Sequence, residues 1–275
     1  MPKEMLPVVD KPLIQYAVEE AAEAGIEQFI FVTGRGKGAI ENHFDHSFEL
    51  EQTLRVHSKQ AALDLTQEML QSPGSFAYVR QQEPAGLGHA VWCARHLVPD
   101  EPVAILLADD LIYNSDKSGC LKQMIDVYRS DELWGGNLLA LMEVPPEDTA
   151  AYGMIKPGVH REYHEAQLVE VLGLVEKPRP VDAPSQLAVV GRYIIEPGVF
   201  SELGMGEAGA GGEIQLTDSL ARRVGHAPFY GLMFEGERFD CGAKLGFLSA
   251  NIALALTRPE LSSGLRDWIT KRLEG

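Results

Sequence analysis

Cysteine is scarce in this chain of 275 residues, which contains only Cys93, Cys120 and Cys241. Three widely separated cysteines cannot build a disulfide framework, and they lack the spacing of a four-ligand zinc site. Such scarcity is typical of proteins that work in a reducing compartment. We therefore expect a cytoplasmic protein.

Long hydrophobic runs and clustered positive charge are also missing. No apolar segment approaches the ~20 residues that span a membrane, and no charged start followed by an apolar core indicates a signal peptide, so neither export nor membrane insertion is predicted. The 24 Lys and Arg residues are outnumbered by 40 Asp and Glu residues, which gives a formal net charge of −16. This balance argues against binding to nucleic acid or to an anionic membrane surface.

Several familiar catalytic motifs are absent. The chain has no G-x-S-x-G nucleophile elbow, and no strand is followed by G-x-G-x-x-G with an acidic residue about 20 residues later, which disfavours a nicotinamide oxidoreductase. The glycine-rich segment Gly34-Arg-Gly-Lys-Gly38 lacks the spacing of a phosphate-binding P-loop. We interpret it as a structural turn, in which glycine supplies positive φ angles.

A short apolar run that ends on two carboxylates is the most informative local feature. Residues 103–108 are all apolar and show no alternation, which predicts a central parallel strand buried on both faces. Asp109 and Asp110 follow directly. Because the carboxyl ends of strands open onto the ligand crevice of an α/β sheet, these two anions predict a Mg²⁺ site that faces phosphates. From these residues alone, the start of a solvated loop is the alternative.

The order of helical and extended patterns indicates the fold class. The two patterns alternate through residue 144, and strand-like segments with little helix between them follow up to residue 195. This order predicts an α/β fold with a doubly wound, mostly parallel mixed sheet and a late antiparallel extension. We expect one domain over residues 1–275, with parts at 1–144 and 145–257 and a C-terminal helix at 258–275.

A second glycine-rich segment, residues 83–88, lies between a predicted strand and a predicted helix. This order places backbone N–H groups where they could bind a base or a phosphate. A plain connecting turn is the alternative.

Five short segments occur in a fixed order along the chain. They are Pro2-Lys-Glu-Met-Leu-Pro-Val-Val-Asp-Lys-Pro12, Gly86-Leu-Gly-His-Ala90, Leu107-Ala-Asp-Asp110, Val175-Glu-Lys-Pro178 and Asp240-Cys-Gly242. Together they resemble the sugar-1-phosphate nucleotidylyltransferases, and among these the bacterial UTP:glucose-1-phosphate uridylyltransferases. Residues 33–37 and 212–218 extend the resemblance to nearly the whole chain. Each motif is weak alone, whereas the ordered set is specific.

The resemblance implies a Rossmann-like nucleotidyltransferase fold and an in-line transfer. A phosphate oxygen of glucose 1-phosphate would attack the α-phosphorus of UTP, and pyrophosphate would leave. Such a reaction needs no protein nucleophile, because positioning and charge neutralisation supply the catalysis. Residues 1–144 would then bind the nucleotide and residues 145–257 the sugar.

The resemblance assigns five residues to the nucleotide and the metal ion. Lys3 would contact the nucleotide phosphates, while Gln81 and Gly86 would read the uracil edge. Asp109 and Asp240 would hold Mg²⁺. Lys3 and the two aspartates are expected to be catalytic. On residue type alone, a solvated surface lysine at Lys3 and a turn residue at Asp240 are the favoured interpretations, and the joint order of the motifs reverses that preference.

Four more residues are assigned to the sugar phosphate. Gly153 and Glu176 would bind glucose hydroxyls, Lys177 would meet the phosphate as a catalytic residue, and Asp110 would touch the sugar or cap its loop. Neighbouring side chains on a regular strand point to opposite faces, so we predict an irregular strand end at Glu176 and Lys177. Without the resemblance, an exposed strand end is the alternative.

The chain departs from the family pattern in two places. The family normally begins with a strand and a Gly-x-Gly-Thr-Arg loop immediately before the Pro-Lys-Glu-Met-Leu-Pro segment, and neither precedes that segment here. We therefore expect a shortened version that is poorly stable and weakly active. Ala108 also stands where many relatives have proline, which leaves the carboxylates in place.

The combined prediction is a Mg²⁺-dependent uridylyltransferase that converts UTP and glucose 1-phosphate into UDP-glucose and pyrophosphate, as a homodimer or homotetramer. A thymidylyltransferase of the same fold is one alternative. A catalytically impaired subunit that binds nucleotide sugars is another.

Overall fold

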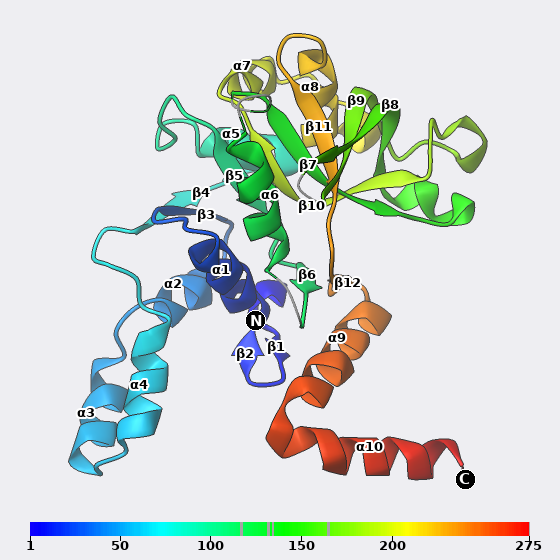
Figure 1. The fold of residues 1–275 in the computed structure, drawn as a ribbon. Helices are drawn as coiled ribbons and strands as arrows, with labels where there is room; N and C mark the ends of the chain where they lie inside the picture. The colour runs from blue at the N-terminus through cyan, green and yellow to red at the C-terminus, as the bar shows by residue number, and fades with distance from the viewer. Residues whose placement is uncertain (116–117, 131–132, 134, 164–165, 275) are drawn as a thin grey trace.

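The computed structural model describes residues 1–115, 118–130, 133, 135–163 and 166–274. At its centre lies a six-stranded sheet in the order β5-β10-β7-β11-β9-β8 (Figure 1). These strands are β5 (Val103–Leu106), β7 (Asn137–Glu143), β8 (Gly153–Tyr163), β9 (Ala166–Glu176), β10 (Leu187–Ile195) and β11 (Phe229–Met233). β7 and β11 run parallel, whereas β10 is antiparallel to both β5 and β7. The predicted mixed α/β class is confirmed, with β8 and β9 as its antiparallel hairpin.

The middle of the sheet is apolar on both faces because β7 carries a continuous run of aliphatic side chains. Leu138 and Ala140 pack with α1 (Leu13–Glu23) and α6 (Cys120–Tyr128). The alternate residues Leu139 and Leu141 pack on the other side with α5 (Leu87–Cys93), α7 (Gly198–Gly204) and α8 (Leu216–Arg223). Because successive side chains of a strand point to opposite faces, this run holds a helix layer on each side.

The described residues also form three two-stranded sheets, which lie on one side of the six-stranded sheet (Figure 1). β3 (Phe29–Thr33) and β4 (Phe76–Arg80) form a parallel pair, and β6 (Asp110–Tyr113) pairs antiparallel with β12 (Glu237–Asp240). β1 (Pro7–Val8) and β2 (Lys11–Pro12) form a short hairpin next to the 3-10 helix η1 (Lys3–Met5). The β6–β12 pair continues directly from the loop after β5, so it positions the two aspartates of that loop.

The predicted position of the strand that precedes Asp109 and Asp110 was wrong. β5 is not a central strand buried on both faces; it lies at the edge of the six-stranded sheet beside β10, and its residues are half-buried. Its other edge borders a cleft of about 910 Å³ that β3 lines from the opposite side. Within the described part of the chain, no strand pairs with that edge. The apolar run at residues 103–108 is therefore explained by packing against β10 at one edge of β5 and by the apolar wall of the cleft at the other.

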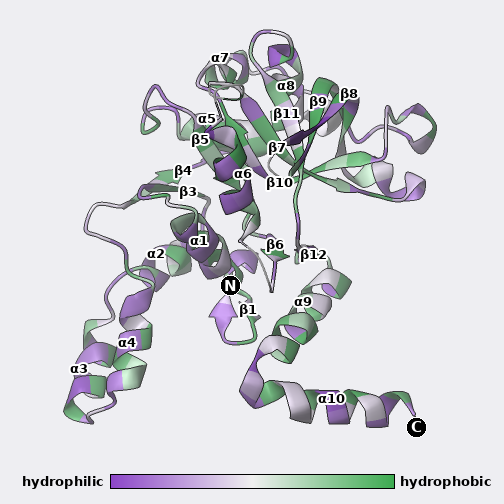
Figure 2. Cartoon of the chain, in the orientation of Figure 1, coloured by the Kyte–Doolittle hydropathy of each residue, from purple (hydrophilic) through white to green (hydrophobic). Residues whose placement is uncertain are grey.

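The remaining helices extend away from the sheet. α2 (Gly38–His43) leads to α3 (Phe48–Val56) and α4 (Gln60–Glu68), which pack side by side and project on one side of Figure 1. Figure 2 shows hydrophobic and hydrophilic residues alternating around these two helices. α9 (Lys244–Thr257) and α10 (Pro259–Leu273) project on the other side. No helix in the described ranges is both long enough and apolar enough to cross a bilayer.

Candidate active site

The two adjacent aspartates after β5 lie in opposite environments. The Asp109 side chain is 31% exposed, whereas that of Asp110 is 8% exposed. The loop that carries them is held by backbone bonds: the N–H of Leu107 donates to the carbonyl of Gly191 at 2.9 Å, and the N–H of Asp110 donates to the carbonyl of Leu107 at 3.2 Å. One carboxylate is therefore available to a ligand, while the other serves the protein interior.

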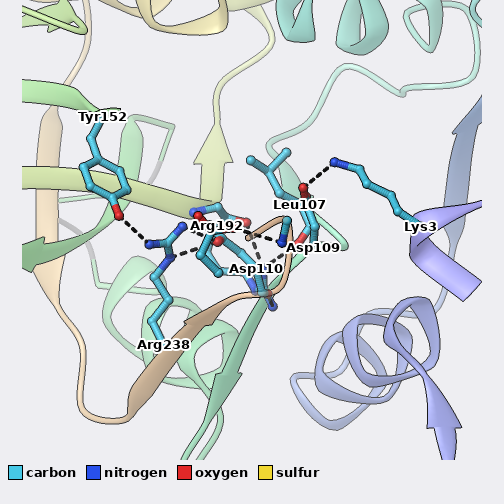
Figure 3. A network of polar contacts seen from close by, with 10 residues as sticks. Lys3, Leu107, Asp109, Asp110, Tyr152, Arg192 and Arg238 are labelled. Atoms are coloured by element: carbon cyan, nitrogen blue, oxygen red, sulfur yellow. Dashed lines mark hydrogen bonds and ion pairs between the residues drawn. The ribbon is translucent and has the colours of Figure 1, made fainter. Parts of the chain in front are cut away.

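The helix η1 brings Lys3 to Asp109. Lys3 Nζ lies 2.5 Å from Asp109 Oδ2 (Figure 3). The next residue, Glu4, accepts a hydrogen bond from Lys37 after β3. Burial alone would lower the pKa of Lys3, but the hydrogen bond to Asp109 and the nearby acidic charges raise it above its ordinary value. Lys3 therefore carries a full positive charge at neutral pH. η1 also ties together the ends of β3 and β5, which line opposite sides of the cleft.

Strand β12 brings Asp240 close to Asp109. The register of β6 and β12 pairs Asp240 with Asp110, and the N–H of Cys241 donates to the backbone carbonyl of Asp109 at 2.8 Å. A side-chain carbon at Gly242 would lie 3.0 Å from Asp240 Oδ1 and 3.3 Å from Asp109 Oδ2. The two carboxylates thus converge beside Gly242, where a side chain would be tightly packed against both.

These carboxylates suit a hard divalent cation. No cluster of three or more His, Cys, Asp or Glu ligands was found in the described ranges, so the protein offers two carboxylates and no closed cage. Mg²⁺ typically takes one or two carboxylates and completes its shell with water and substrate phosphates. Asp109 and Asp240 therefore fit a cation that binds together with a phosphate ligand.

The segment after β4 carries Gln81 and Gly86, which are hydrogen-bonded to each other. Gln81 Nε2 donates to the carbonyl of Gly86 at 3.1 Å and lies 3.0 Å from His89 Nδ1. Gly86 has φ +102°, and a side-chain carbon there would lie 2.8 Å from the carbonyl oxygen of Ile214. Glycine is thus required by conformation and by close packing. Gln81 and Gly86 line the cleft together with Lys3 and Asp109.

A second group forms at the ends of β8 and β9. Gly153 pairs with Glu176, and a side-chain carbon at Gly153 would lie 3.2 Å from Glu176 Oε2. Lys177 adopts φ +47°, and its Nζ lies 3.7 Å from Glu176 Oε1. The predicted irregular strand end is confirmed, because this left-handed conformation turns both side chains to one side. The N–H of Lys177 also donates to the carbonyl of Tyr152 at 3.0 Å.

Asp110 is enclosed by protein donors. Arg238 Nε donates to Asp110 Oδ1 at 2.9 Å, and Arg238 Nη2 also contacts this oxygen. Asp110 Oδ2 accepts the N–H of Gly191 at 2.8 Å. Arg238 Nη1 donates to the Tyr152 hydroxyl at 3.0 Å (Figure 3). Both oxygens of Asp110 therefore have partners, which favours the loop-holding role over direct contact with a sugar.

Behind this site lies a buried ion pair. Arg192 Nη2 and Glu20 Oε2 are 2.7 Å apart, and both side chains are almost fully buried. The remaining donors of Arg192 bind the carbonyls of Leu107 and Asp110 at 3.1 and 2.9 Å. Burial opposes the charge, but Glu20 raises the pKa of Arg192 above its ordinary value. This pair fixes the backbone of the aspartate loop.

The structure thus places the residues singled out from the sequence in two groups. Lys3, Gln81, Gly86 and Asp109 line one cleft, while Gly153, Glu176 and Lys177 gather at the β8–β9 ends. Asp110 and Asp240 lie on the paired strands between these groups.

Sequence reasoning missed the residues that connect these groups. They are Glu20, Tyr152, Arg192 and Arg238. Two signals were present in the sequence. Glu20 is an acidic residue on a helix face otherwise formed by Leu13, Ala17 and Ala21. Arg238 also precedes Asp240 by two positions, which puts both side chains on one face of a strand.

Three comparisons relate the chain to known proteins. The profile of the family described as nucleotidyl transferase matches residues 1–256. The chain is 46% identical over 269 residues to a UTP--glucose-1-phosphate uridylyltransferase of Komagataeibacter xylinus, which covers 98% of this chain and 89% of that protein.

Solved structures of similar proteins have the same fold. A UTP-bound UGPase from Acinetobacter baumannii superposes with a TM-score of 0.88 at 37% identity, over 98% of this chain and 91% of that chain. A UDP-glucose pyrophosphorylase complexed with UDP-glucose superposes with a TM-score of 0.83 at 40% identity, over 94% and 92%.

Proposed function

The chain belongs to the nucleotidyl transferase family, and from this premise we propose that it transfers a uridylyl group from UTP to glucose 1-phosphate, giving UDP-glucose and pyrophosphate. The observation that carries the proposal is its near full-length similarity to UTP--glucose-1-phosphate uridylyltransferases. The convergence of Asp109, Asp240 and Lys3 beside an open cleft supports it, because such a site collects the charge that a triphosphate needs.

The reaction is an in-line substitution at phosphorus. A phosphate oxygen of glucose 1-phosphate forms a bond to the α-phosphorus of UTP while the bond from that phosphorus to pyrophosphate breaks. The protein forms no covalent intermediate, so its work is to position two anionic substrates and to offset their charge. Lys3 supplies fixed positive charge to the nucleotide phosphates, and Gln81 with Gly86 meets the uracil edge.

Asp109 and Asp240 are the residues that would hold Mg²⁺. The ion, when bound, supplies positive charge and a template for the triphosphate. Lys3 Nζ donates a hydrogen bond to Asp109 Oδ2 at 2.5 Å, so this lysine orients the carboxylate and offsets its charge.

The sugar phosphate is assigned to the second group. Gly153 leaves room for a glucose ring beside Glu176, because any side chain there would approach the carboxylate at 3.2 Å. Glu176 accepts bonds from glucose hydroxyls, and Lys177 pairs with the phosphate. Asp110 contributes to this subsite by holding its scaffold, since both its oxygens bind protein donors.

The test measures product formation from defined substrates. The purified chain with Mg²⁺, UTP and glucose 1-phosphate should release pyrophosphate and form UDP-glucose, detected by mass spectrometry. Substituting dTTP should give a lower rate. Faster reaction with dTTP would favour a thymidylyltransferase, and binding of UDP-glucose without pyrophosphate release would favour an impaired binding subunit.

Separate variants test whether Glu176 and Lys177 bind glucose 1-phosphate and not UTP. Glu176→Ala and Lys177→Ala should each raise the KM for glucose 1-phosphate about tenfold and leave the KM for UTP unchanged, because a charged hydrogen bond contributes about 1.5–3 kcal/mol. Glu162→Ala on the exposed part of β8 is the control. Equal effects on both substrates would contradict the assignment.

The chain is further proposed to assemble as a homodimer or homotetramer in the cytoplasm. The support for assembly is the apolar surface of α9 and α10, where Leu245 is 77% exposed and Trp268 is 61% exposed. The scarcity of cysteine supports a reducing compartment. Native mass spectrometry and cell fractionation test these two points, and a monomer at micromolar concentration would contradict the first.

A further inference from the structure

Arg238 occupies the junction between the two substrate subsites. It lies on β12, two positions before Asp240, with its side chain 10% exposed. Its guanidinium binds Asp110 through Nε and Nη2 and the hydroxyl of Tyr152 through Nη1. Its central carbon also lies 5.2 Å from the centre of the Tyr152 ring. Every nitrogen of this side chain therefore has a protein partner (Figure 3).

We propose that Arg238 is a positioning residue that sets the sugar subsite at a defined place relative to the metal-site aspartates, acting through Tyr152. The inference rests on the proposed function and deepens it. It assigns specificity for the sugar phosphate to a bridge that does not touch the substrate.

The bridge runs through consecutive contacts. Tyr152 is bound at its hydroxyl by Arg238, and its backbone carbonyl accepts the N–H of Lys177 at 3.0 Å. The next residue, Gly153, pairs with Glu176. A shift of Tyr152 would therefore move Glu176 and Lys177, the two charged residues assigned to the sugar phosphate.

At its other end, the bridge is anchored to the metal site. Asp110 follows Asp109 directly, and its second oxygen is held by the N–H of Gly191 at 2.8 Å. Asp240 lies on the same strand as Arg238 and pairs with Asp110. One guanidinium thus connects the segments that carry the metal-site carboxylates to the segment that carries the sugar subsite.

Only arginine can make this connection. Its planar fork presents several N–H donors in a fixed geometry, so it can bind a carboxylate on one side and a hydroxyl on the other. A lysine in its place would keep the charge beside Asp110 but would lose the geometry that reaches Tyr152. The hydroxyl of Tyr152 can be removed separately, which isolates the positioning effect from the ion pair.

The experiment compares Tyr152→Phe and Arg238→Lys with the parent chain. KM for glucose 1-phosphate, KM for UTP and kcat are measured with the thermal midpoint. Tyr152→Phe should raise the KM for glucose 1-phosphate about fivefold, keep the KM for UTP and shift the midpoint little, because one hydrogen bond from the Arg238 guanidinium is lost while its ion pair with Asp110 is kept. Arg238→Lys should show the same split with a larger change.

Tyr128→Phe is the matched control, because it removes a buried hydroxyl that donates to the carbonyl of Gly136 at 2.9 Å in another part of the chain. It should leave both KM values unchanged. Equal changes of the two KM values in Tyr152→Phe, or no change in either, would overturn the proposal. If Arg238→Lys does not fold, Tyr152→Phe alone decides.

A failure of the proposed function would look different. The parent chain would then form no UDP-glucose, and the variants would be compared by calorimetric binding of glucose 1-phosphate and UTP. Selective weakening of glucose 1-phosphate in Tyr152→Phe would still support the bridge. Unchanged binding of both compounds, or equal weakening, would refute it.

Discussion

The two flanks of β5 differ sharply. On the β10 side, Gly191 and Arg192 bind the aspartate loop through backbone and guanidinium groups, and even the buried carboxylate of Asp110 has partners on both oxygens. On the β3 side, the edge of β5 faces a cleft of about 910 Å³ with largely apolar walls. One flank is closed by polar contacts, while the other is open.

The difference separates two tasks. A carboxylate that must meet a metal ion needs an immobile backbone, and the closed flank supplies it through the buried Glu20–Arg192 pair. A ligand needs accessible polar groups, and the mouth of the open flank supplies them at Lys3 and Asp109. Loss of the Glu20–Arg192 pair on the closed flank should therefore act on stability, and changes at the mouth of the open flank should act on catalysis.

The largest effect is expected from filling the apolar part of the open flank, away from the polar mouth at Lys3 and Asp109. Joining to the protein an apolar strand of about five residues that pairs with the cleft-facing edge of β5 should raise the unfolding free energy by several kcal/mol, because each buried apolar side chain contributes ~1.5–3 kcal/mol. Thermal melting is the measurement. The same added strand with serine in place of the apolar residues is the control. Equal melting of the parent protein and the variant with the apolar strand would refute this expectation.

Next in size is the loss of the buried ion pair on the closed flank. Glu20→Gln leaves the charge of Arg192 buried without its carboxylate, which should cost about 3–5 kcal/mol of unfolding free energy. Urea denaturation measures the change. Glu19→Gln is the matched control on the same helix, because Glu19 pairs with Lys11 in a partly exposed bridge worth about 0–1 kcal/mol. A loss no greater than that of the control would show that the pair does not stabilise the loop.

Replacing either metal-site carboxylate should lower turnover, and the change in activation free energy should be smaller than the two changes in unfolding free energy above. Asp109→Asn and Asp240→Asn should each lower turnover about 100-fold or more at saturating Mg²⁺, equivalent to about 2.7 kcal/mol, while the thermal midpoint stays near that of the parent. Asp126→Asn, on the exposed face of α6, is the control. Parental turnover in either variant would remove that residue from the metal site.

The smallest effect on stability is expected for Lys3. Its bridge to Asp109 is 57% exposed on the lysine side, so Lys3→Met should change the unfolding free energy by only about 0–1 kcal/mol. The same change should raise the KM for UTP about tenfold, since a charged contact to phosphate is lost. An unchanged KM would contradict the assignment.

The pH dependence of Lys3 follows from its raised pKa. A lysine with a raised pKa keeps its contribution below the ordinary value of 10.5 and loses it only as the pH rises through the higher folded value. UTP affinity should therefore show no titration from Lys3 between about pH 7 and pH 9. A loss of affinity in that range that is absent from Lys3→Met would contradict this sign.

Much of the candidate site was predicted from short motifs, through the family resemblance that their order along the chain carries. The aspartates after an apolar strand, the Glu-Lys-Pro strand end and the glycine-rich loop before α5 are short segments whose chemistry depends on residue type and spacing. Even the irregular geometry at Lys177 followed from placing two neighbouring side chains on one face of a strand. Such features lie within a few residues, where backbone sterics and strand alternation limit the possibilities.

The contacts across the fold could not be read in this way. Glu20 and Arg192 are 172 positions apart, and Asp110 and Arg238 are 128 apart, so their pairing depends on strand order and on the register of β6 with β12. The edge position of β5 likewise depends on which strands find partners, because an apolar run looks the same beside a strand and beside a cleft. Residue type and period set the chemistry available to this chain, whereas long-range packing selected which carboxylate is exposed at the cleft and which is held by an arginine.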